Sequence, residues 1–127
     1  DAERLRQYCR QVMDGMNTGL FSYVAHPDVF NFTGDPAVYQ KHFRELCREA
    51  RSCGLPLEIN LLGLGENRHY PNPLFWQVAA EEGCNAVLGC DAHKPEALLD
   101  VATADRAYAM AKQLGLTVVD TVPLKII

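Results

Sequence analysis

Short apolar segments alternate with amphipathic helical segments along this chain, and a polar residue follows each apolar run. The residues in those positions are His26, Asn60, Asp91 and Asp120, at intervals of 34, 31 and 29 residues. Strands that alternate with helices in this way form right-handed parallel β/α units, so the sequence predicts an α/β fold. No sequence repeat accompanies the spacing, which therefore reflects architecture and not a duplicated solenoid.

The expected helices are recognised by apolar residues at helical spacing and by capping residues at their ends. They cover residues 3–14, 36–53, 73–82 and, after a cap at Thr103, 104–114. Apolar runs rich in β-forming residues predict strands at 20–25, 57–60, 86–90 and 116–119. The longest stretch without a periodic pattern is 63–71, which follows a strand, where active-site loops belong.

Four strands with their helices amount to about half of a β/α barrel. A half-barrel has open parallel edges, and such edges are usually covered or paired with another strand. We therefore expect the 127 residues to form, as a single partial domain, either a small open sheet or the second half of a larger barrel. The chain begins with Asp1 and not with methionine, which fits a piece of a longer protein.

Composition and charge narrow the possible partners. A formal net charge of −4 and an isoelectric point near 5.5 give no sign of the basic face that binds nucleic acid. No apolar run approaches the roughly 20 residues of a membrane span, and no signal-peptide pattern is visible. The five cysteines are odd in number and lack metal or redox spacing, so we expect reduced, partly buried thiols and a cytoplasmic protein.

Two of the predicted strand ends carry residues that bind metal ions. Asp91 and His93 follow the third predicted strand, and residues two apart on extended backbone point to the same side. His26 ends the first predicted strand, where Pro27 fixes the local backbone. Because imidazole and carboxylate groups both bind Zn, Mn and Fe, we expect His26, Asp91 and His93 to share a metal site. The alternatives are a helix cap for Asp91, a loop position for His93 and a structural turn at His26.

The second predicted strand and the loop after it offer groups that suit a ligand. Asn60 lies nearer the carboxyl end of that strand than Glu58, so it is better placed to orient a ligand or a bound water. Arg68 follows in the loop, and its planar guanidinium group suits a phosphate beside metal ions. The alternative for Arg68 is a solvated loop position.

Taken together, these segments resemble the later motifs of the PHP (polymerase and histidinol phosphatase) family. The resemblance lies within roughly residues 8–99 and is carried by His26-Pro27-Asp28, Glu58-Ile59-Asn60 and Asp91-Ala92-His93-Lys94-Pro95. The nearest likeness is to histidinol-phosphate phosphatases, in which a Glu-Ile-Asn strand leads into a glycine-containing loop with Arg and Tyr-Pro. The corresponding loop here contains Gly63 and then Arg68-His69-Tyr70-Pro71.

The resemblance implies a distorted seven-stranded TIM-like β/α barrel with two or three divalent metal ions (Zn, Mn or Fe) at its mouth. It implies hydrolysis of a small phosphate ester, most closely histidinol phosphate to histidinol and phosphate in histidine biosynthesis. His26, Asp91 and His93 would bind metal, and the last two would also be catalytic. Asn60 and Arg68 would bind the substrate phosphate. Asp28 would orient His26 from behind.

The family opens with a His-x-His motif and further metal ligands that this sequence does not contain. We therefore expect the chain to be the C-terminal half of such an enzyme, inactive alone, with the N-terminal half of the barrel as its partner. An oligomer of half-barrels would also cover the open edges. Two alternatives remain: a non-catalytic β/α module that binds through its sheet edge, and a PHP phosphodiesterase or nuclease.

Overall fold

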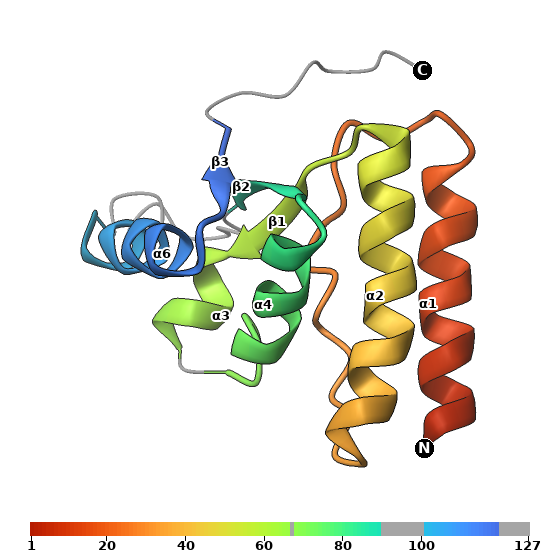
Figure 1. The fold of residues 1–127 in the computed structure, drawn as a ribbon. Coiled ribbons are helices and arrows are strands. Elements are labelled where there is room, and N and C mark those ends of the chain that lie inside the picture. Colours follow the sequence, from red (N-terminus) through yellow and green to blue (C-terminus); the bar gives the residue numbers. More distant parts are fainter. Residues whose placement is uncertain (67, 90–100, 120–127) are drawn as a thin grey trace.

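The computed structural model describes residues 1–66, 68–89 and 101–119 of the chain (Figure 1). Its elements are, in chain order, α1 (Ala2–Met16), α2 (Pro36–Cys53), β1 (Leu57–Asn60), α3 (Leu61–Gly65), α4 (Pro73–Glu81), β2 (Asn85–Gly89), α6 (Val101–Leu114) and β3 (Thr117–Val118). The strands form one sheet in the order β1-β2-β3. Both pairings are parallel, with Asn60 opposite Gly89 and Asn85 opposite Thr117. The prediction of a parallel α/β arrangement is confirmed.

The capping residues define the two best-marked helices. The Asp35 side chain accepts a hydrogen bond from the Ala37 N–H at 2.9 Å, and Gly54 ends α2 with a left-handed φ of 69°. Asn72 caps α4 in the same way, accepting from the Leu74 N–H at 3.0 Å. The expected helices at 36–53 and 73–82 are therefore confirmed to within one residue.

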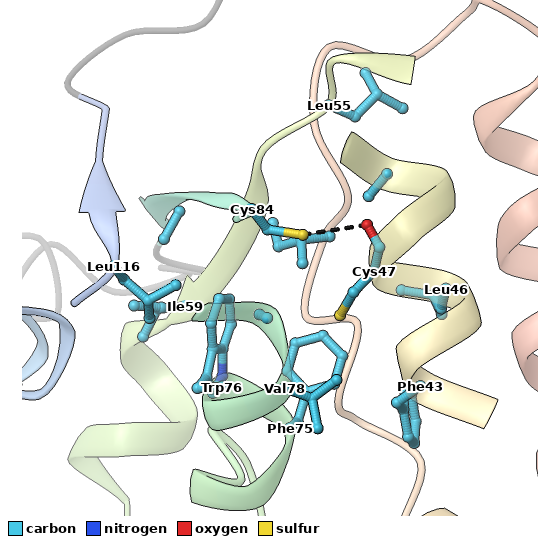
Figure 2. Close-up of a cluster of buried hydrophobic side chains, with 14 of the residues drawn as sticks. Phe43, Leu46, Cys47, Leu55, Ile59, Phe75, Trp76, Val78, Cys84 and Leu116 are labelled. Atoms are coloured by element: carbon cyan, nitrogen blue, oxygen red, sulfur yellow. Dashed lines mark hydrogen bonds between the residues drawn. The ribbon is translucent and has the colours of Figure 1, made fainter. Parts of the chain in front are cut away.

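A single apolar core joins the sheet to its helices. Figure 1 shows α1 and α2 side by side, with α4 lying between α2 and α6. The side chains that α2, α4 and β1 bury together include Phe43, Leu46, Cys47, Leu57, Ile59, Phe75, Trp76 and Val78, most of which are labelled in Figure 2. Leu57 and Ile59 alternate with Glu58 and Asn60, so the polar residues of β1 lie on the opposite face of the strand from the core.

The expected strand at 20–25 is wrong in extent. Only Val24 bridges to Leu57: its N–H donates to the Pro56 carbonyl at 3.0 Å, and its own carbonyl accepts from the Glu58 N–H at 2.9 Å. Gly19 and His26, both with positive φ, bend the backbone on either side of this segment. The extended run is therefore too short to form a ladder.

Two further expectations need correction. Thr103 lies inside α6, which begins at Val101, and not at its cap; the Thr103 side chain is buried, so packing determines its position. The stretch 63–71 is not entirely loop, because α3 extends to Gly65. Asn60 stabilises the start of α3 by accepting a hydrogen bond from the Gly63 N–H at 2.9 Å.

The cysteines described by the structure are free thiols. Cys9, Cys47 and Cys84 are buried and Cys53 is exposed, while Cys90 lies outside the described residues. The Cys84 thiol donates to the Cys47 carbonyl at 3.2 Å within the core (Figure 2). Among the helices of the described ranges, none combines the length and hydropathy that a membrane span requires.

Candidate functional site

The predicted site residues divide into a described and an undescribed group. His26, Asp28, Asn60 and Arg68 are described by the structure. Asp91 and His93 lie outside the described residues, so their expected roles stay predictions. The described part of the site is built around the carboxyl end of β1, where parallel β/α folds bind ligands.

Glu58 and Asn60 form the base of this site. Both side chains are buried, with 2% and 0% of their surface exposed. The Asn60 amide donates from Nδ2 to Glu58 Oε1 at 3.1 Å, while its Oδ1 holds the Gly63 N–H of α3. Buried polar groups are costly unless they are hydrogen-bonded, so this pairing explains how β1 accommodates both.

His26 joins the same carboxylate through its backbone. Its N–H donates to Glu58 Oε1 at 3.0 Å, and its carbonyl accepts from the Val29 N–H at 3.1 Å. His26 has a φ of 24°, which is rare for a residue with a side chain and is further restricted here by the proline that follows. We call His26, Glu58, Asn60 and Gly63 the Glu58 network.

The Asp28 side chain is hydrogen-bonded to a different element, α4 and its N-terminal cap. Its side chain is fully buried, and Oδ2 accepts from the Asn72 N–H at 2.6 Å and from Trp76 Nε1 at 3.0 Å. Its Oδ1 has no hydrogen-bond partner among the described residues. Burial raises the pKa of Asp28 to about 6, against the lowering effect of these hydrogen bonds and of nearby His26. The carboxylate therefore ties the turn after His26 to the start of α4.

Arg68 is hydrogen-bonded to Tyr70, whose ring lies near that of His26. Its guanidinium donates to the Tyr70 hydroxyl at 2.9 Å and to Glu66 at 2.7 Å, and these hydrogen bonds raise its pKa. The Tyr70 ring lies 6.1 Å from the His26 ring, measured between centroids. The Arg68 side chain remains 44% exposed, and its guanidinium forms an ion pair with the carboxylate of Glu66.

A metal ion would find only part of a ligand set in the described ranges. Within them, no three His, Cys, Asp or Glu side chains lie close enough together to hold one. The fully buried Asp28 has one oxygen without a partner, and the buried Glu58 forms no ion pair with any described residue. Buried carboxylates without a cation are costly, so each of these two carboxylates is compatible with a nearby cation.

The neighbouring strand ends at the same place. Gly89 of β2 pairs with Asn60 of β1, and a Cβ atom on Gly89 would lie 1.9 Å from Glu58 Oε2. Asp91 comes two residues after Gly89 in the sequence. The structure therefore brings together His26, Asn60 and, through Tyr70, Arg68, whereas the side-chain hydrogen bonds of Asp28 go to residues at the start of α4.

Glu58 is the residue to which sequence reasoning gave no role. The sequence feature that could have identified Glu58 is its two-residue spacing from Asn60, which places both side chains on one face of β1. In comparisons with known proteins, no family model and no curated protein matches this chain.

Proposed function

We propose that this chain forms part of a metal-dependent phosphomonoesterase of the PHP type, acting on histidinol phosphate. The observation that carries the proposal is the Glu58 network, which connects His26 to Asn60 at the carboxyl end of a parallel sheet. On this proposal β1, β2 and β3 belong to the second half of a distorted seven-stranded barrel. The resemblance of its His-Pro-Asp, Glu-Ile-Asn and Asp-x-His motifs to that family supports the substrate class.

The residues of the chain take separate roles in this proposal. His26, Asp91 and His93 hold divalent metal ions, and the remaining ligands come from outside these 127 residues. Zn, Mn or Fe held by these residues would lower the pKa of a bound water and neutralise charge on the phosphoryl group. Arg68 binds the phosphate with its exposed guanidinium, which its hydrogen bond to Tyr70 orients.

Calorimetric titration of Mn²⁺ into the 127-residue chain tests the proposal. Replacing His26 with alanine should weaken binding by at least about tenfold, because loss of even an outer partner of a metal site costs that much. His42→Ala is the matched control, since His42 lies on α2 beside Arg6 and Lys41, outside the Glu58 network. Equal affinity in the wild type and His26→Ala, or no binding by the wild type, contradicts the metal role.

One observation favours a second function, that of a non-catalytic binding module. Leu20, Phe21 and Tyr23 are exposed in the segment that meets the sheet through the Val24–Leu57 bridge. That segment and α1 together line a mainly apolar pocket of about 470 Å³. Exposed apolar edges favour pairing with an added strand. Such a module would bind a polypeptide strand at this edge, and His26→Ala would leave that binding unchanged.

A further inference from the structure

Glu58 is a buried carboxylate that the roles above leave unassigned. Only 2% of its surface is exposed, and it forms no ion pair with any residue in the described ranges. Its Oε1 atom accepts two hydrogen bonds, from the backbone of His26 and from the side chain of Asn60. An acid buried at such cost calls for a reason beyond packing, because an apolar side chain would fill the same space more cheaply.

The first reason is the backbone of His26. A φ of 24° just before a proline is an unfavourable conformation, and such conformations persist only when the surrounding structure enforces them. The His26 carbonyl accepts from the local Val29 N–H, and the His26 N–H donates to the Glu58 carboxylate of β1. The hydrogen bond to Glu58 is therefore a tertiary contact that holds the His26 backbone in this conformation.

The second reason is the space that β2 leaves for the carboxylate. A Cβ atom at Gly89 would lie 1.9 Å from Glu58 Oε2 and 2.3 Å from its Cδ, far inside van der Waals contact. Gly89 is not among the glycines with positive φ, so the backbone conformation is not what requires glycine there. The missing side chain instead lets Glu58 lie against the end of β2.

We propose that Glu58 is a positioning residue that fixes the His26 backbone and aligns the ends of β1 and β2 beneath the site. The contribution of His26 to metal binding rests on the function proposed above, but its backbone position does not. Glu58 acts through the hydrogen bonds that its Oε1 accepts. The neutral amide of glutamine keeps such an acceptor and should substitute for it, whereas alanine should not.

Amide hydrogen exchange of His26 and calorimetric Mn²⁺ affinity test the proposal in four variants: Glu58→Ala, Glu58→Gln, Gly89→Ala and the double variant Glu58→Ala/Gly89→Ala. Glu58→Ala should speed exchange of the His26 amide by at least about tenfold, because its hydrogen-bond acceptor is gone. It should also weaken Mn²⁺ binding by at least about tenfold. Glu58→Gln should restore both values to near those of the wild type. Gly89→Ala should resemble Glu58→Ala, and should add little in the Glu58→Ala background, since the carboxylate it displaces is already absent.

The outcomes separate this proposal from the proposed function. Equal exchange of the His26 amide in the wild type and Glu58→Ala overturns the positioning role. Glu58→Gln could also lose Mn²⁺ binding while the His26 amide stays protected from exchange. That result overturns the positioning role, because Glu58 then acts on metal binding through its charge. Faster exchange in Glu58→Ala with no effect of His26→Ala on Mn²⁺ binding supports positioning and contradicts the metal function. If Glu58→Ala does not fold, Gly89→Ala and Glu58→Gln provide the same comparison.

Discussion

At the scale of single residues, some candidate site residues can be recognised in the sequence by side-chain type, whereas others are recognised only by the contacts that they form in the fold. His26, Asn60 and Arg68 could be picked out as candidates because side chains of these types can bind metal ions or phosphate, and because each lies at or after the end of a predicted strand. Glu58 could not, because its importance comes from a backbone N–H 32 residues earlier in the chain and from a glycine on the next strand. Contacts of that kind arise only once the strands are paired.

The burial of Asp28 is likewise a property of the fold that the sequence does not show. It leads to a prediction on the pH dependence of stability. Its raised pKa means that the native state holds its proton more tightly than the unfolded state does. The native state therefore carries the extra proton between the ordinary value of 3.8 and about 6, and the free energy of unfolding falls as pH rises through that window. The full effect, reached above about pH 6, is about 3 kcal/mol.

Urea unfolding of the metal-free chain between pH 4 and 7, with chelator present, measures this effect. Asp28→Asn should remove most of the decrease, because an amide in place of the carboxyl group does not titrate. All other side chains are the same in both proteins, so the difference between their pH profiles isolates Asp28. Identical profiles for the two proteins contradict the assigned role of burial.

At the scale of elements, the sequence predicted best where local chemistry is enough. Asp35 and Gly54 delimit α2, and Asn72 begins α4, because side-chain caps and a left-handed glycine act within one turn. The short α3 was missed because five residues give no periodic pattern, and its start depends on the buried Asn60. Strand 20–25 was overestimated because β propensity does not reveal how many residues find a partner.

The cap of α2 provides a prediction at this scale. Asp35→Ala should lower the free energy of unfolding by about 1 kcal/mol, since the Ala37 N–H loses its acceptor. Asp14→Ala is a matched control on α1, where the carboxylate lies 3.9 Å from Arg10 and is 72% exposed. That surface pair should contribute less than about 0.5 kcal/mol. Equal losses in chemical denaturation of the two variants would show that the Asp35 cap has no special role.

At the scale of the whole molecule, the alternation of strands and helices predicted the parallel sheet, and the order β1-β2-β3 follows the chain. That outcome has a physical basis, because parallel neighbours need helical crossovers and crossovers impose a regular spacing. Closure into a barrel is a different question. It depends on strands beyond those paired here, so it stays part of the proposed function.

On the proposed function, His26, Asp91 and His93 hold divalent metal. Elemental analysis for Zn, Mn and Fe, after the purified chain is loaded with each metal and desalted, tests it most directly. The wild type should retain metal, and the triple variant His26→Ala/Asp91→Ala/His93→Ala should lose it while keeping the same circular dichroism spectrum. Equal metal content in the two proteins, or none in the wild type, would contradict metal binding by these three residues.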